Sequence, residues 1–342
     1  MPATSAVRPL LKWAGGKRQL LPVLRRYYPV AFDRYVEPFL GSGAVFFDLF
    51  GAGRLDGRRV GLADVNPDVI GCYRAVRDDP EAVIVALAAL AAEHFERGDA
   101  CYYDVRDRRF NPARAARRDL RRGGDSALAA GYTPAMAAML IYLNRTGYNG
   151  LFRLNRRGGF NVPAGRYAEP RICDAGHVRA CARALSARGV SIECAPFDGT
   201  LANTRTGDFV YCDPPYAPLS RTANFAHYTA GGFTAHDQRR LQQAVVGAAR
   251  RGALVLLSNS SAPEIEAAYA GADARVAGLR VRRVPARRAI NSRAARRGPV
   301  DELIITNTGP RDLPAPRTLR MAKARLRAAD PQQRPAARAT TR

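Results

Sequence analysis

The stretch Asp208-Phe209-Val210-Tyr211-Cys212-Asp213-Pro214-Pro215-Tyr216 determines how the rest of the chain is organised. Its first five residues form a short run rich in β-formers, which predicts a buried strand because the run is too short for a helix. The two prolines that follow fix φ and keep the preceding residue out of the helical region. The sequence therefore predicts a rigid elbow at the carboxyl end of a strand, where open α/β sheets bind ligands.

The elbow carries groups suited to a planar ring that bears an amine. Asp213 and the backbone carbonyls after it can accept hydrogen bonds from an NH2 group, and Tyr216 offers an aromatic face for stacking. The same residues also fit a proline-rich turn with a buried tyrosine. The stretch alone therefore leaves a binding role and a purely structural role open.

Length and composition limit the class of protein. The chain has 342 residues, 47% of them hydrophobic, which suffices for one large domain with an insertion or for two domains. No apolar run approaches the roughly 18 residues of a transmembrane helix, and Met1 to Leu11 lacks the apolar core of a signal peptide. The six cysteines show no C-x-x-C pair and no zinc-type spacing. We therefore expect a cytoplasmic protein with reduced cysteines and no metal.

The chain is strongly basic. Its formal net charge of +24 suggests a polyanionic partner. Arginine and alanine are abundant throughout, which also fits a biased genome composition, and charge alone would fit a ribosomal or chromatin-type protein equally well. Residues 310–342 are rich in Pro, Arg, Ala and Gln, so we expect a disordered basic tail that adds non-specific affinity for polyanions.

A glycine-rich turn and a spaced acid predict a nucleoside site. Tyr35 to Phe46 predicts a strand, a turn and a helix, in which Gly41 and Gly43 let the backbone approach a ligand. The dinucleotide fingerprint would place a third glycine at position 46, where Phe46 stands. The next predicted strand ends in Asp64, the usual position of an acid that contacts ribose hydroxyls. Together these features predict a bound nucleoside without a pyrophosphate.

Two segments between the predicted strands are rich in arginine. For Tyr102 to Arg122, a solvated helical face or loop and a set of phosphate contacts both stay open. Residues 143–163 mix aromatics, amides, arginines and glycines, and Arg156 to Gly159 predicts the tip of a β-hairpin. Because arginine reads guanine edges, amides read adenine edges and an aromatic ring can wedge into a base stack, this segment predicts contacts to the bases of a duplex.

The remaining pattern predicts further elements. We expect helices over Lys17 to Tyr27, Pro67 to Val76, Pro80 to Phe95, Ala135 to Leu143 and His236 to Arg250, the third of them structural. Asn66 and Thr234 are the expected caps of the second and the fifth helix. We expect strands over Val60 to Ala63, Gly189 to Ala195, Gly252 to Leu257, Val276 to Val284 and Val300 to Asn307. We also expect a lid at Thr222 to Thr229.

The assembled motifs resemble the Dam-type DNA adenine-N6 methyltransferases, the D12 class or class alpha. The matching motifs run from Lys12 to Asn307 and are K-W-A-G-G-K at 12–17, E-P-F-L-G-S-G at 37–43, the acid Asp64, L-N-R-T-G-Y-N-G-L-F-R at 143–153, F-N-V-P-A-G-R-Y at 160–167, D-P-P-Y at 213–216 and an S-N turn at 258–259. D-P-P-Y occurs in amino-methylating enzymes of several classes, whereas the 143–167 block resembles members that act on GATC. Ser260 departs from the family, since many relatives carry His there, and the tail from residue 310 has no counterpart.

The resemblance implies an α/β fold, a Rossmann-like S-adenosylmethionine-dependent methyltransferase sheet with an inserted helical and β-hairpin target-recognition domain. It implies a catalytic domain whose cofactor-binding half is residues 1–77 and whose D-P-P-Y half is residues 189–309. The insertion spans 78–188, with a DNA-reading hairpin at about 144–168, and the tail is 310–342.

The resemblance also implies S-adenosylmethionine as the methyl donor and no metal. The residues expected to bind this cofactor are Trp13, Lys17, Phe39, Gly41, Gly43, Asp64 and Asp213. Asp64 would accept from the ribose hydroxyls, and Lys17 would also counter the methionine carboxylate. The catalytic residues would be Asp213 and Pro214, accepting from both N–H groups of an adenine, and Tyr216, stacking on its ring. Because the target must leave the duplex, base flipping follows from the chemistry.

The expected partner is double-stranded DNA, read at GATC. The residues assigned to DNA by resemblance are Tyr148 as a wedge, Asn149, Arg153 at a guanine edge, Pro163 and Tyr167, with Arg145, Arg166 and the Arg287–Arg293 loop as phosphate contacts. We expect a monomer in the bacterial cytoplasm, nucleoid-associated or phage-encoded, without membrane contact and with a restriction endonuclease as a possible partner.

Three other classes of protein fit part of the sequence. A DNA-binding protein without catalysis would not need Asp213, Asp64 and Lys17 together. A methyltransferase acting on RNA or on a protein amide would not need the DNA-type hairpin. A nicotinamide oxidoreductase would need the glycine that Phe46 replaces.

Overall fold

The computed structural model describes residues 7–13, 15, 17–118, 129, 131–217, 232–287 and 299–310. The chain divides into two units, Met1–Gly309 and Pro310–Arg342. The expected lid at Thr222 to Thr229, most of the Arg287–Arg293 loop and the tail beyond residue 310 lie outside the described residues.

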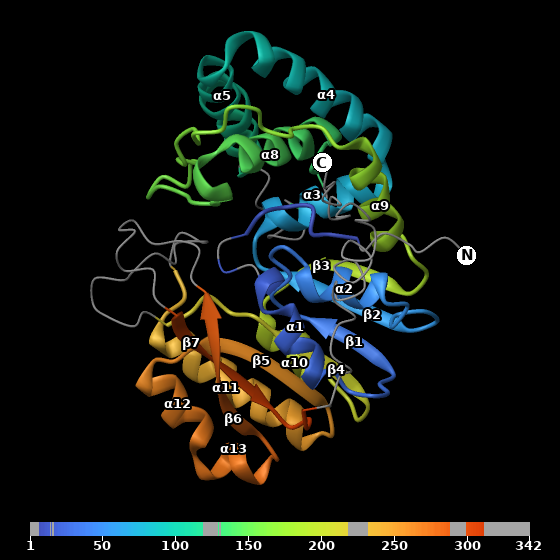
Figure 1. The fold of residues 1–342 in the computed structure, drawn as a ribbon, viewed down its shortest axis with the longest axis vertical. Helices are drawn as coiled ribbons and strands as arrows, with labels where there is room; N and C mark the ends of the chain where they lie inside the picture. Colours follow the sequence, from blue (N-terminus) through green and yellow to red (C-terminus); the bar gives the residue numbers. More distant parts are fainter. Residues whose placement is uncertain are drawn as a thin grey trace, which may run out of the picture. The chain divides into compact units, whose positions relative to one another are not determined.

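A seven-stranded sheet forms the centre of the first unit, in the order β3-β2-β1-β4-β5-β7-β6 (Figure 1). The strands are β1 (Arg34–Glu37), β2 (Arg59–Asp64), β3 (Val190–Cys194), β4 (Asp208–Cys212), β5 (Leu254–Ser260), β6 (Arg280–Arg287) and β7 (Pro299–Thr306). The first five pair in parallel, whereas β7 runs antiparallel to both β5 and β6. The strand order reverses between β1 and β4, so their carboxyl ends flank the switch point at which doubly wound sheets bind ligands.

The strand β4 shows why the sheet is covered on both faces. All of its residues are buried, and successive side chains point to opposite faces. Phe209 and Tyr211 belong to one hydrophobic core, and Val210 and Cys212 belong to the other. The helices α1 (Leu21–Leu24), α2 (Ala44–Gly51), α3 (Pro67–Asp78) and α9 (Ala175–Leu185) contribute to the first core, and α10 (Phe197–Ala202), α11 (Ala235–Arg250), α12 (Pro263–Ala270) and α13 (Ala272–Val276) to the second.

The segment between α3 and β3 forms a group of helices and a hairpin. Besides α9, its described helices are α4 (Pro80–Arg97), α5 (Asp99–Asp104), the π-helix η3 (Val105–Phe110), α6 (Asn111–Arg118), α8 (Pro134–Thr146) and the short η5 (Tyr148–Gly150). Figure 1 shows α4, α5 and α8 grouped together, and α3 contacts both α8 and β3. Gly71 on α3 permits this approach, because a Cβ there would lie 2.4 Å from the ring of Tyr132. The domain boundaries at residues 77 and 188 stay a prediction.

Local capping confirms several predicted boundaries. The Asn66 side chain accepts from the first backbone N–H groups of α3, and Thr234 and Asp237 form a capping box at the start of α11. The bounds of β4 are those the sequence predicts.

Three predicted elements were wrong. Lys17 to Tyr27 is not one helix but η1 (Lys17–Gln19), α1 and η2 (Arg25–Tyr27), because Pro22 lacks an N–H and fits only the first turn of a helix. Val276 ends α13, since Gly278 at φ 82° terminates that helix before β6 begins. Ser258 and Asn259 are not a turn, because their pairing with β7 extends β5 to Ser260.

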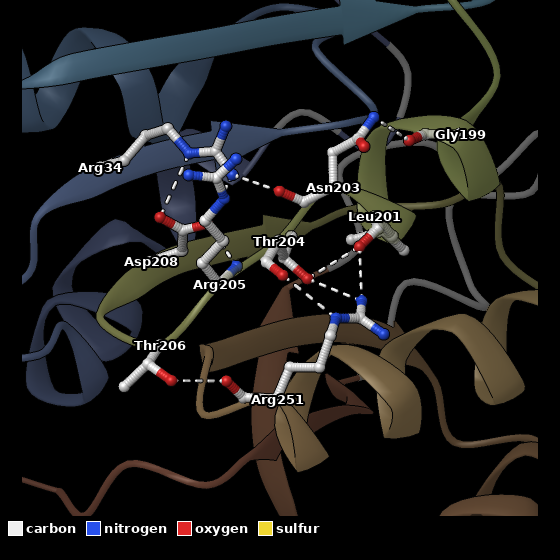
Figure 2. A network of polar contacts seen from close by, with 9 residues as sticks. All are labelled: Arg34, Gly199, Leu201, Asn203, Thr204, Arg205, Thr206, Asp208 and Arg251. Atoms are coloured by element: carbon white, nitrogen blue, oxygen red, sulfur yellow. Dashed lines mark hydrogen bonds and ion pairs between the residues drawn. The ribbon is translucent and has the colours of Figure 1, made fainter.

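A polar network fixes the amino end of β4 (Figure 2). Arg34 on β1 is the register partner of Asp208 on β4. The Nε atom of Arg34 donates to Asp208 Oδ1 at 3.2 Å, and its Nη2 pairs with Asp208 Oδ2. The Arg205 backbone N–H donates to the same Oδ2 at 2.8 Å. Arg251, after α11, donates to the carbonyls of Leu201 at 2.7 Å and Thr204 at 3.1 Å. The start of the strand that leads to the elbow is therefore tied to β1, α10 and α11.

Candidate active site

The glycine loop after β1 has a backbone that only glycine adopts readily. Gly41 and Gly43 have φ of 45° and 65°, in the left-handed region. A Cβ at Gly41 would lie 3.0 Å from Cδ1 of Trp13, so the indole ring packs directly against the loop. Trp13 in turn stacks on Phe152 with ring centroids 5.6 Å apart. The structure thus brings together the Trp13 and glycine-loop residues that the sequence assigned to the cofactor.

Asp64 holds this loop to the end of β2. Its Oδ2 accepts from the Gly41 N–H and its Oδ1 from the Asn66 N–H, each at 2.9 Å. Burial raises the pKa of Asp64, and the backbone N–H groups of Gly41 and Asn66 oppose that rise. The sequence predicted that Asp64 contacts a ligand, but it did not predict that Asp64 also holds the glycine loop.

Phe39 lies in a cluster of three aromatic rings. It stacks on Phe197 of α10 at 5.4 Å between centroids, and the ring of Phe233, just before α11, lies edge-on at 5.9 Å. Phe197, which precedes β4, and Phe233, which follows the elbow, therefore position the Phe39 side chain just after β1.

Asp213, the acid of the elbow, forms an ion pair with Lys17. The Oδ1 atom of Asp213 lies 2.8 Å from Lys17 Nζ and accepts from Ser258 Oγ at 3.1 Å. The Lys17 side chain is only 4% exposed, while Asp213 is 21% exposed. Lys17 Nζ also lies 4.4 Å from the centroid of the Tyr216 ring, close enough for a cation–π contact. Residues predicted from three separate motifs thus meet in one place.

The backbone of the elbow is held from two sides. Gln238 on α11 donates to the Pro215 carbonyl at 2.9 Å, and its own carbonyl accepts from Asn259 at 3.0 Å. Ser260 Oγ donates to the Ala217 carbonyl at 2.8 Å. Side chains of α11 and β5 therefore fix the course of the chain after the prolines. Gln238 was missed by sequence reasoning, because nothing within α11 distinguishes it from a surface glutamine.

The first two residues of the elbow, Asp213 and Pro214, each carry a hydrogen-bond acceptor. Among the residues that the structure describes, nothing donates to the Pro214 carbonyl oxygen or to Asp213 Oδ2. These acceptors belong to consecutive residues at the carboxyl end of β4. A group with two N–H donors, such as an aromatic amine, matches such a pair.

Burial sets the protonation chemistry around the elbow. It raises the pKa of Asp213, and the charge and hydrogen bond of Lys17 oppose the rise. Burial also raises the pKa of Glu37, at the end of β1, well above its ordinary value. The Cys212 thiol has a raised pKa for the same reason, so it is a poor nucleophile.

The segment predicted to read bases forms the expected hairpin. Leu154 bridges Phe160 in antiparallel fashion, and the Gly158 N–H closes the tip on the Asn155 carbonyl at 2.7 Å. Tyr148 is 46% exposed, beside Asn149 at φ 54°.

The other predicted DNA contacts differ in exposure. Pro163 and Arg153 are exposed, and Arg153 donates to the Asn161 side chain at 2.9 Å. Tyr167 is 39% exposed. Arg145 is half-buried, where it donates to the Arg171 carbonyl at 2.9 Å, and burial lowers its pKa. Asn149 and Arg166 are exposed as well, so Arg145 is less exposed than the six other predicted DNA contacts between residues 145 and 167.

Side chains of the arginine-rich helices donate hydrogen bonds to the backbone of the hairpin. Arg106 donates to the Val162 carbonyl at 2.9 Å, Asn111 to the Phe160 carbonyl at 2.9 Å, and Arg114 to the Gly158 carbonyl at 2.6 Å. Arg114 is buried and paired with Asp68 at 2.7 Å, which offsets the cost of burying its charge. For Arg114, both interpretations left open by the sequence were wrong, because the side chain lies in the interior.

Lys12 is a further residue that sequence reasoning did not single out. Its backbone N–H donates to Asn144 Oδ1 at 2.7 Å, and Asn144 Nδ2 donates back to its carbonyl at 2.8 Å. Its Nζ lies 4.6 Å from the centroid of the Tyr167 ring. The motif that supplies Trp13 to the glycine loop and Lys17 to the elbow thus also carries a cation to the hairpin.

These features define a class of protein. The sheet order with β7 antiparallel, the left-handed glycine loop after β1 and the proline elbow after β4 form the fold of S-adenosylmethionine-dependent methyltransferases.

Within the described part of the chain, no helix is long and apolar enough to cross a bilayer.

Comparison with known proteins narrows the class. The model of the family "D12 class N6 adenine-specific DNA methyltransferase" matches residues 13–282. The chain is 34% identical over 303 residues to a type II methyltransferase, M1.LlaDCHI, of Lactococcus lactis subsp. cremoris, covering 89% of this chain and 96% of the relative. It is 36% identical over 302 residues to a DNA adenine methylase of Vibrio cholerae (88% and 96% covered) and 35% identical over 297 residues to that of Escherichia coli K12 (87% and 94% covered). The chain therefore belongs to the D12 class of N6 adenine-specific DNA methyltransferases.

Proposed function

We propose that this protein transfers the methyl group of S-adenosylmethionine to N6 of an adenine that has been flipped out of duplex DNA, within the sequence GATC. The observation that carries the proposal is a pair of acceptors that no described residue uses, Asp213 Oδ2 and the Pro214 carbonyl, close to the ring of Tyr216. Family membership supplies the substrate class and the methyl donor.

The elbow solves the main chemical problem of this reaction. The adenine amine is a poor nucleophile because its lone pair is delocalised into the ring. Acceptance of both N–H groups by Asp213 and Pro214 favours a pyramidal nitrogen, whose lone pair is aimed at the methyl group. Tyr216 stacks on the base and fixes its plane. The raised pKa of Asp213 makes it a better proton acceptor than an exposed carboxylate.

The residues around the glycine loop fit the cofactor. Gly41 and Gly43, both left-handed, have no side chain where the adenosyl group would lie, and the Trp13 ring packs against the loop at Gly41. Asp64 keeps carboxylate lone pairs beyond its two backbone bonds, and these would accept from the ribose hydroxyls. Lys17 would counter the methionine carboxylate, and Phe39 would line the site. Bound S-adenosylmethionine supplies an electrophilic methyl group on a sulfonium.

The hairpin provides the reading of bases in this proposal. Tyr148 is the wedge that enters the stack, and Arg153 reads a guanine edge, with Asn149, Pro163 and Tyr167 beside them. The exposure of Tyr148 and Tyr167 supports this assignment. Arg145 and Arg166 remain proposed phosphate contacts. It stays a prediction that the enzyme is monomeric and cytoplasmic and that it has a cognate restriction endonuclease.

Methylation assays on matched duplexes test the proposal. The purified chain is incubated with labelled cofactor and duplexes that contain GATC or a single-base variant of it, and the nucleosides are analysed by mass spectrometry. We expect N6-methyladenine in GATC only, and its absence with Asp213→Ala, which should still bind DNA. Methylation of RNA or protein instead of DNA, or near-wild-type turnover of Asp213→Ala, would contradict the mechanism.

Arg153→Ala tests the reading of the sequence. We expect discrimination at one base pair to fall by about 1–3 kcal/mol, because a bidentate contact to guanine is lost. Competition between GATC and its single-base variants measures this change. An equal loss of affinity for all duplexes would make Arg153 a phosphate contact.

A further inference from the structure

Glu302 on β7 contacts the stacking ring of the elbow. The Tyr216 hydroxyl donates to Glu302 Oε2 at 2.7 Å across 86 positions of sequence. Glu302 lies opposite Ser260 of β5 and Val284 of β6 in the ladder, so its backbone is fixed on both sides. We propose that Glu302 is a positioning residue that holds the Tyr216 ring in the plane that receives the target adenine. This inference rests on the proposed function.

The contact completes a three-point hold on Tyr216. The carbonyl before the ring, of Pro215, accepts from Gln238, and the carbonyl after it, of Ala217, accepts from Ser260. These bonds fix the backbone but leave the side chain free to turn about its own torsions. The hydrogen bond to Glu302 fixes the far end of that side chain, and its anchor belongs to a strand inside the sheet.

The protonation state of the phenol keeps the contact in place. Burial raises the pKa of Tyr216 well above its ordinary value, and the charges of Asp213 and Glu302 add to the rise. The hydroxyl therefore remains a donor at neutral and mildly alkaline pH. A hydrogen bond to a carboxylate is stronger than one between neutral groups, which suits a ring that must keep one orientation.

A set of four variants tests the proposal: Glu302→Ala, Glu302→Gln, Tyr216→Phe and the double variant of Glu302→Ala with Tyr216→Phe. Single-turnover methyl transfer and the Kd for a GATC duplex are measured for each. We expect Glu302→Ala to lower the transfer rate about tenfold with little change in Kd, since a hydrogen bond to a charged group is lost. Glu302→Gln should retain most of the rate, because its amide oxygen accepts the same bond.

The double variant separates positioning from a general structural role. If Glu302 acts through the phenol, the double variant should be no slower than Tyr216→Phe alone, because the two changes remove one interaction. Asp301→Asn is the matched control, since it removes the neighbouring acid of β7, whose side chain is exposed. It should leave the rate unchanged. Thermal melting of each variant checks that the protein remains folded.

Several results would overturn the proposal. They are a wild-type rate in Glu302→Ala, a loss in Glu302→Gln as large as in Glu302→Ala, and losses that multiply in the double variant. The proposed function fails separately, if the unaltered chain transfers no methyl group to adenine. An active unaltered chain with an equally active Glu302→Ala variant would refute only the role of Glu302.

Discussion

The two ends of β4 carry the same type of ion pair for different purposes. At the amino end, Asp208 pairs with Arg34, and both of its oxygens accept hydrogen bonds. At the carboxyl end, Asp213 pairs with Lys17, but only Oδ1 is used by the described residues. Both oxygens of Asp208 therefore bind within the fold, whereas Asp213 Oδ2 has no donor among the described residues and can accept from a ligand.

The largest expected effect is at the carboxyl end. Asp213→Asn keeps the shape of the side chain but removes its charge. We expect methyl transfer to fall by about 100- to 1000-fold, as when one preorganised electrostatic contact to a transition state is lost. Single-turnover kinetics measure the fall, and DNA affinity serves as the control for folding. A variant with an unchanged rate would remove the distinction between the two ends.

The same substitution at the amino end should have the opposite profile. Asp208→Asn breaks a largely buried pair with Arg34, and we expect the free energy of unfolding to decrease by about 1–3 kcal/mol. Arg34 is 27% exposed, so solvent screening keeps the loss below that of a fully buried pair. Urea unfolding measures it. At a temperature where the variant is folded, methyl transfer should remain near the wild-type rate, and a specific loss of catalysis would contradict this.

Glu37, at the carboxyl end of β1, adds a third carboxyl to the comparison. Burial raises its pKa well above 4.5, so the folded state binds the proton more tightly than the unfolded state. Stability therefore falls as pH rises from about 4.5 through the raised folded pKa. Glu37→Gln should remove this dependence and be more stable above that range, by about 1.4 kcal/mol per unit of pKa difference. Unfolding curves that run parallel across pH would exclude the effect.

The smallest expected effect concerns Ser258, which donates to the same oxygen of Asp213 that pairs with Lys17. Ser258→Ala removes its hydrogen bond, and we expect the transfer rate to fall about threefold to tenfold, in line with a net loss of roughly 1 kcal/mol. Lys17 still holds the same oxygen, so the carboxylate should stay in place. A loss as large as that of Asp213→Asn would mean that Ser258 contacts the reacting atoms.

Local patterns predicted the parts of the molecule that depend on neighbouring residues. The bounds of β4, the Asn66 and Thr234 caps and the hairpin tip follow from residues close in sequence. The contact of Glu302 with Tyr216 was not predictable in this way, because it depends on where β7 lies in the sheet. The burial of Arg114 was missed for a similar reason, since its partner Asp68 lies 46 positions earlier.

The hydrogen bonds that hold the hairpin backbone have a consequence for which of its residues can change. Arg106, Asn111 and Arg114 hold the hairpin by the carbonyls of residues 162, 160 and 158, which are alternate positions of one strand-like segment. Every amino acid has a carbonyl, so this frame does not depend on the side chains that it carries. In the proposed function, substitutions at exposed positions such as Pro163 would alter the bases that are read while the backbone stays in register. On that proposal, the hairpin is a scaffold that could acquire new target sequences without a new fold.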